Sequence, residues 1–113
     1  MTNPQRGELM IQLGQKNFKA RVTVDNISRI EAQLDTTIMQ LAQRLSDGSL
    51  KITDQVAVLT PVIRAGGNNV NEKEISELVF GSMVDSLKAI GEIVSNVLSV
   101  GEDEGNVEKV ESQ

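Results

Sequence analysis

The sequence predicts an α+β domain: an N-terminal two-stranded antiparallel β-hairpin packed on a bundle of about four α-helices, followed by a disordered acidic tail. Three observations carry this prediction. Two short segments near the start alternate apolar and polar residues, apolar residues then recur at helical spacing, and the chain ends in a run of acids. A length of 113 residues suits one domain, which we expect over residues 1–101, with the tail over residues 102–113.

The hairpin is predicted from residues 8–13 and 18–24, in which every second residue is apolar. Residues 14–17, Gly-Gln-Lys-Asn, suit the connecting turn because Gly and Asn adopt the positive φ angles that short hairpins need. Met10 is the exception, an apolar residue on the polar side. A lone hairpin is marginal in water, so its apolar face should pack on the helices that follow.

The first helix is predicted to begin at Asp25 or Asn26, either of which can cap it, and to end at Asp47 before Gly48. Its apolar residues recur at spacings of three or four, which places them on one face. This continuous stripe consists of Ile27, Ile30, Leu34, Ile38, Leu41 and Leu45.

The second helix is predicted to start at Thr53 as its cap, with Asp54 at its positive end, and to stop at residues 66–67, Gly-Gly. Pro61 lies inside it and predicts a kink or a new turn, because proline cannot donate the i→i−4 hydrogen bond.

Two more helices follow the Gly/Asn loop. The third begins at Asn71, and Glu74 three residues later favours a capping box. We expect a break near residues 80–82, where Gly81 weakens the pattern, before the last helix. Gly91 inside that helix indicates a close helix contact, and Gly101 is expected to end it.

The composition argues against an enzyme. The chain has no cysteine and no histidine, which removes disulfides, thiolate nucleophiles, the commonest general base and the commonest metal ligand. Glu72 and Glu74 point away from each other on a helix, so capping explains them better than catalysis. The run over residues 66–69 follows a helix and lacks a phosphate-loop pattern. We therefore expect no catalytic residue, metal or cofactor.

Charge and hydropathy limit the partners. The tail carries five acids and one lysine, a net charge of −4, which leaves a nearly neutral body with a net charge of −1. A neutral body with an acidic tail argues against a nucleic-acid-binding regulator. We expect no membrane association and a cytoplasmic location, because the sequence has no signal-like start and no run near the ~20 apolar residues that span a bilayer.

The last helix offers the candidate binding surface. Its broad apolar stripe carries few charges, which suits either a central core helix or a face that binds a partner helix or a second copy. Both interpretations stay open, because different faces can serve each. The candidate partner-binding residues are Leu78, Phe80, Met83, Leu87, Ile90 and Val94.

Residues 3–45, which read NPQRGELMIQLGQKNFKARVTVDNISRIEAQLDTTIMQLAQRL, resemble the start of the family of phage and gene-transfer-agent tail assembly chaperones. The similarity includes the lead Asn-Pro-x-Arg-Gly-Glu, the hairpin with Gly14 in its turn, and the pair Ile30-Glu31 in the helix. Two later blocks, residues 49–54 and 70–78, are similar as well. The resemblance covers residues 3–100, and its motifs are structural.

This resemblance implies an assembly chaperone that keeps the long, helical tape measure protein soluble and helps the tail tube to polymerise around it. The implied partners are the tape measure protein and the tail tube protein, and a core this small also allows a homo-oligomer. Such a chaperone acts in the bacterial host cytoplasm and is expected to be absent from the finished particle. The alternative is a structural tube or connector subunit, since the family has also been labelled a tail tube protein. A tube subunit, however, is a β-rich sandwich, and the sequence predicts only two strands.

Overall fold

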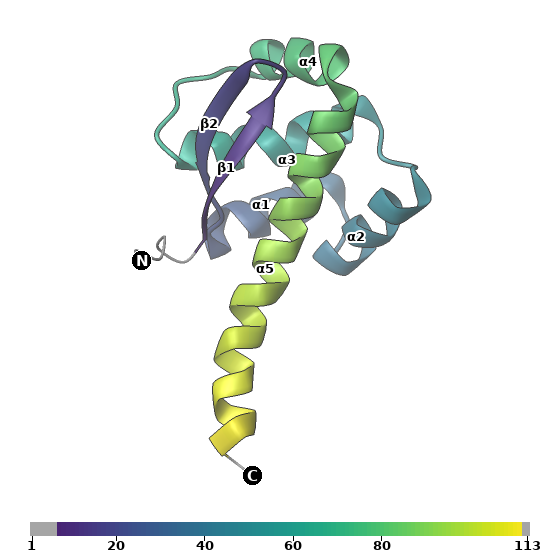
Figure 1. Ribbon diagram of the computed structural model, residues 1–113. Coiled ribbons are helices and arrows are strands. Elements are labelled where there is room, and N and C mark those ends of the chain that lie inside the picture. Colours follow the sequence, from purple (N-terminus) through teal and green to yellow (C-terminus); the bar gives the residue numbers. More distant parts are fainter. Residues whose placement is uncertain (1–6, 112–113) are drawn as a thin grey trace.

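The computed structural model describes the backbone of residues 7–111 and the side chains of residues 7–99. The predicted α+β architecture is confirmed: a two-stranded antiparallel hairpin is followed by five helices (Figure 1). The elements are β1 (Glu8–Leu13), β2 (Lys16–Arg21), α1 (Val24–Leu34), α2 (Ile38–Asp47), α3 (Ile52–Ala65), α4 (Glu72–Gly81) and α5 (Met83–Glu111).

The hairpin turns over two residues, Gly14 and Gln15, and its register pairs Leu13 with Lys16. Gly14 has a φ of 64°, the left-handed conformation that favours glycine in such turns. The turn is shorter than predicted because residues 16 and 17 already pair in β2. Apolar side chains of β1 and β2 enter the core, and Ile11 and Leu13 are fully buried.

The single first helix predicted over residues 26–47 is wrong, because the structure divides it into α1 and α2. Asp35 ends α1 in the left-handed conformation, with a φ of 51°. Thr37 then caps α2 in a reciprocal pair: its Oγ1 accepts from the Gln40 N–H at 3.0 Å, and its own N–H donates to Gln40 Oε1 at 3.1 Å. A strong local cap outweighs a continuous apolar stripe, and this adds the fifth helix.

The predicted caps of the first two helical segments are also corrected. Thr23, rather than Asp25 or Asn26, caps α1: its Oγ1 accepts from the Asn26 N–H at 3.1 Å. The cap of α3 is Lys51 instead of Thr53, and Asp54 Oδ2 accepts from the Lys51 N–H at 3.2 Å.

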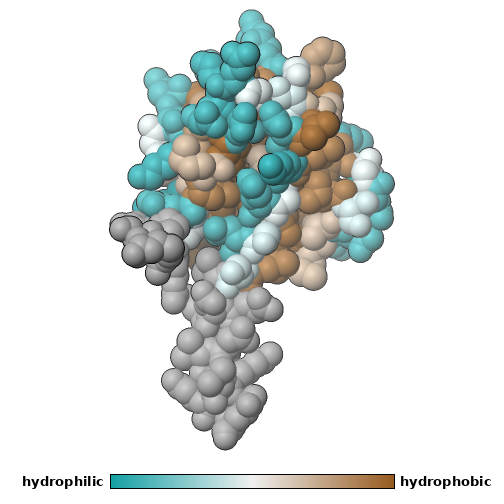
Figure 2. Space-filling model, viewed as in Figure 1, coloured by the Kyte–Doolittle hydropathy of each residue, from teal (hydrophilic) through white to brown (hydrophobic). Residues whose placement is uncertain are grey.

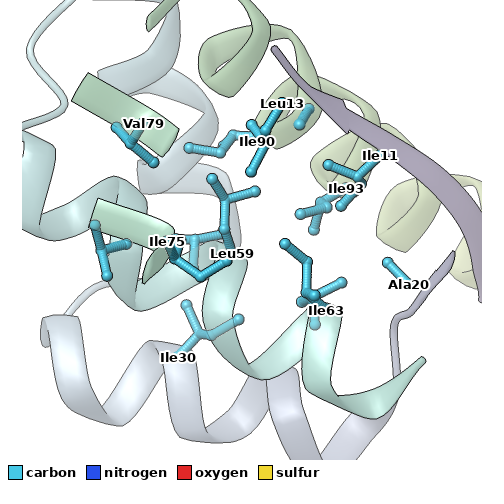
Figure 3. Close-up of a cluster of buried hydrophobic side chains, with 14 of the residues drawn as sticks. Ile11, Leu13, Ala20, Ile30, Leu59, Ile63, Ile75, Val79, Ile90 and Ile93 are labelled. Atoms are coloured by element: carbon cyan, nitrogen blue, oxygen red, sulfur yellow. The ribbon is translucent and has the colours of Figure 1, made fainter. Parts of the chain in front are cut away.

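Helix α3 is the centre of the core. It is one continuous helix over 14 residues, so Pro61 starts no new helix. Leu59 and Ile63 of α3 lie among apolar side chains from the hairpin, α1, α4 and α5 (Figure 3). The labelled neighbours in that view are Ile11, Leu13, Ala20, Ile30, Ile75, Val79, Ile90 and Ile93.

The end of α3 lies directly against β2. A Cβ at Gly66 would overlap the carbonyl group of Lys19. Asn68 contacts the same Lys19 carbonyl. Its Nδ2 donates to Lys19 O at 2.6 Å and to Ile63 O at 2.9 Å. The sequence predicted the Gly/Asn segment as a helix stop. In the structure this segment also forms the contact between the end of α3 and strand β2.

Helix α5 continues to Glu111, past Gly101 where the sequence predicted its end (Figure 1). One glycine costs a helix about 1 kcal/mol relative to alanine and does not by itself stop it. The sequence also predicted a disordered tail over residues 102–113. The side chains of these residues lie outside the described part of the chain.

Candidate partner-binding surface

The structure separates the six predicted partner-binding residues into three groups. Ile90 and Val94 are buried in the core, at 0% and 5% exposure, and are not available to a partner in this structure. Phe80 is 77% exposed. The other three, Leu78, Met83 and Leu87, are partly buried and pack against the core.

The reason for this separation is the corner between α4 and α5. Ser82 leaves the helical conformation, with φ −143° and ψ 61°, and its N–H donates to Leu78 O at 2.9 Å. Its own carbonyl accepts from the Ser86 N–H at 3.0 Å and so starts α5. The chain therefore changes direction between Phe80 and Met83, and a stripe drawn through both helices does not stay on one face.

The hairpin turn holds this corner in place. Asp85 Oδ2 accepts from the Gly14 N–H at 2.9 Å across 71 positions of sequence. Gly14 also lies against Ser82, because an added Cβ there would be 2.8 Å from Ser82 Oγ. Farther along α5, the buried Ser86 Oγ donates to Gln55 Oε1 of α3 at 2.6 Å. These contacts fix the start of α5 on both the sheet and the central helix.

We expect replacement of Asp85 by alanine to lower the free energy of unfolding by about 1–2 kcal/mol, because the Gly14 N–H loses a charged acceptor. Asp85→Asn keeps an acceptor oxygen at the same position and should cost less. Urea denaturation of both variants measures the difference. Equal losses for the two would contradict a role for this hydrogen bond.

Two large apolar side chains remain exposed at this corner. Phe80 closes α4 at 77% exposure, and Val84 opens α5 at 79%. Figure 2 shows hydrophobic surface at this end of α4 and along the first part of α5. We call Phe80, Met83, Val84 and Leu87 the corner patch. Burying a side chain such as Phe80 contributes about 1.5–3 kcal/mol, so the corner patch can bind apolar partner surface.

Val84 is absent from the predicted set. The sequence does place it among the apolar residues of the last helix, directly after Met83. Neighbouring helix residues are about 100° apart, and in α5 such neighbours can both be buried, as Ile93 and Val94 are. The sequence alone therefore does not single out Val84 as exposed.

The predicted acidic pair has a structural role here. Glu72 and Glu74 lie in the first turn of α4, where Asn71 Oδ1 accepts from the Glu74 N–H at 2.8 Å. Carboxylates are favourable at this positive end of a helix. Within the described residues, no three acidic, histidine or cysteine groups gather as a metal site would require.

A protein-family model described as phage tail tube protein, GTA-gp10, matches residues 6–100. No curated protein and no solved structure matches the chain. Among the helices of the described part, none has the length and apolar character needed to cross a membrane.

Proposed function

The chain belongs to the phage tail tube protein, GTA-gp10 family, and from this premise we propose that it is a tail assembly chaperone that binds the tape measure protein. In this role it acts in the host cytoplasm, covers the tape measure protein until the tail tube polymerises around it, and is left out of the finished particle. The observation that carries the proposal is the corner patch, with Phe80 and Val84 exposed at 77% and 79%.

The chemistry of the corner patch suits a helical partner. A long amphipathic helix needs its apolar stripe covered before assembly, and an exposed apolar surface on another protein can cover it reversibly. Phe80 and Val84 are four positions apart on either side of Ser82, so they form a short surface rather than a long groove. A short apolar contact is easily released, which a chaperone requires.

The described residues contain one sheet of two strands, with helices forming the rest of the body. A tube subunit has to build a continuous wall, for which a larger sheet is the expected architecture. The second candidate function is nevertheless a structural tube or connector subunit, because the family description names the tail tube.

Co-expression with the tape measure protein of the same tail tests the proposal. We expect the tape measure protein to be soluble only in the presence of this chain and the two to co-elute in size-exclusion chromatography. Phe80→Asp and Val84→Asp should each weaken this complex at least tenfold, since losing more than about 1.4 kcal/mol of apolar contact gives that factor.

Val24→Asp is the matched control. Val24 is 86% exposed at the start of α1, well away from the corner (Figure 1), so this variant adds the same charge outside the corner patch. It should bind the tape measure protein like the unmodified chain. If both corner variants bind the tape measure protein as tightly as the unmodified chain does, the corner patch is not the binding surface. A tape measure protein that is equally insoluble with and without this chain would overturn the chaperone itself.

A further inference from the structure

The corner between α4 and α5 has one buried anchor, and that anchor is polar. Of residues 80–88, which span the corner, only Ser86 is buried, at 0% exposure. Its Oγ donates to Gln55 Oε1 of α3 at 2.6 Å, and Gln55 is buried as well, at 1% exposure. The apolar neighbours Met83 and Leu87 are only partly buried. A hydrogen bond inside the core therefore connects the corner with the central helix.

The side chain of Gln55 is held at both ends of its amide group. Its Nε2 donates to Leu50 O at 3.3 Å, in the segment before α3, while its Oε1 accepts from Ser86. Thr60 is buried in the same helix, but its Oγ1 has no partner among the described residues. The polar group of Gln55 thus joins two helices, whereas that of Thr60 does not.

A buried hydrogen bond fixes the position of a helix more closely than apolar packing does. Apolar attraction is non-directional, and packed helices can slide past one another by about 1–2 Å. A hydrogen bond of 2.6 Å is lost once its atoms are about 3.6 Å apart, so it tolerates a shift of about 1 Å. Cores repacked with hydrophobic residues of similar volume lose a unique arrangement before they lose stability.

Two features of the corner depend on where Ser86 is held. Asp85, the residue before it, accepts from the Gly14 N–H at 2.9 Å, a distance that a shift of α5 would change. Val84 lies two residues before Ser86 and is 79% exposed. A shift of α5 on α3 would therefore move part of the corner patch and loosen the contact between the corner and the hairpin.

We propose that Gln55 is a positioning residue for the corner patch, and that it acts through Ser86. The buried pair holds the first turns of α5 in one place on α3, and so keeps Val84 in a fixed position relative to the hairpin. The consequence for a partner rests on the proposed function. The consequence for α5 itself does not, and it can be measured without any partner.

Replacing the pair by apolar side chains separates position from stability. Ser86→Ala alone leaves the buried Gln55 Oε1 without a donor, so it should lower the midpoint of urea denaturation. Adding Gln55→Leu removes that unpaired oxygen and should raise the midpoint again, because replacing both partners of a hydrogen bond by apolar groups can be nearly neutral. The double variant should thus be more stable than Ser86→Ala while lacking the hydrogen bond.

The amide NMR signal of Gly14 reports the position of α5, because this N–H is bonded to Asp85. We expect one sharp signal in the unmodified chain, and a broadened or split signal in the double variant Gln55→Leu, Ser86→Ala. Tape measure binding by the double variant should weaken at least threefold. That factor follows if about a third of the molecules hold α5 in the binding arrangement.

Thr60→Val is the matched control, because it removes a buried hydroxyl of α3 that has no partner among the described residues. It should keep the urea midpoint, the single Gly14 signal and the binding of the unmodified chain. A double variant with one sharp Gly14 signal at the unmodified position would overturn the proposal, and so would a double variant less stable than Ser86→Ala. A split Gly14 signal supports the positioning role even if the tape measure protein does not bind the unmodified chain, in which case only the proposed function fails.

Discussion

Replacing Ile90 by alanine is expected to lower the free energy of unfolding by about 3 kcal/mol, because truncation of a fully buried isoleucine loses its transfer energy and leaves a cavity. Ile90 has 0% exposure and lies near Leu13 and Val79 in the core (Figure 3). For a domain of this size, the midpoint of thermal unfolding should fall by about 10–20 °C. Urea and thermal denaturation followed by circular dichroism measure both quantities.

Phe80→Ala is the control for this prediction. Phe80 is 77% exposed, so its truncation should change the free energy of unfolding by about 0.5 kcal/mol or less. The pair separates core from interface within the set that the sequence proposed for partner binding. If Ile90→Ala kept its stability and lost tape measure binding, Ile90 would belong to an interface and its placement in the core would be contradicted.

Replacing Gly66 by alanine should lower the free energy of unfolding by about 2–4 kcal/mol. The φ of Gly66 is −81°, so the effect is not backbone strain. An added Cβ would overlap the Lys19 carbonyl and lie 2.7 Å from Ala20 Cα. The backbone cannot move aside cheaply there, because Asn68 Nδ2 binds the same Lys19 carbonyl at 2.6 Å.

Gly81→Ala is the matched control, since a Cβ at Gly81 would meet nothing within 4 Å. Alanine favours helix over glycine, so this variant should be as stable as the unmodified chain or more stable by up to about 1 kcal/mol. Chemical denaturation of both variants gives the comparison. A Gly66→Ala protein as stable as Gly81→Ala would show that α3 does not approach β2 as closely as described.

Much of the fold follows from local patterns in the sequence. Alternation predicted the hairpin, and helical periodicity with glycine punctuation predicted the helical body. The error over residues 26–47 is instructive, because Thr37 and Gln40 form a cap that competes with continuation of the helix. A cap depends on a few side-chain hydrogen bonds, which a stripe of six apolar residues does not reveal.

The candidate surface was predictable only in part. The sequence identified apolar residues in the last two helices, but burial is decided by which elements pack on them. Ile90 and Val94 belong to the buried core cluster, whereas Phe80 lies in α4, before the turn at Ser82. Two contacts connect residues that are far apart in sequence: the close approach of Gly66 to Lys19, and the hydrogen bond between Gly14 and Asp85. A pattern within a short stretch of sequence cannot predict such contacts.

The predicted relation to phage and gene-transfer-agent tails is confirmed by the family match over residues 6–100. That match establishes a tail-related protein, and the chaperone role is the proposal built on it. The distinction between chaperone and tube subunit therefore concerns where this chain ends up after assembly.

The most direct test is to quantify this chain by mass spectrometry in purified tails or whole particles, relative to the tape measure protein and the main tube subunit. The chaperone account predicts that both of those proteins are present while this chain is depleted from particles and recovered with unassembled tape measure protein. Many copies of this chain in each finished tail, in constant ratio to its length, would contradict the account and identify a structural subunit.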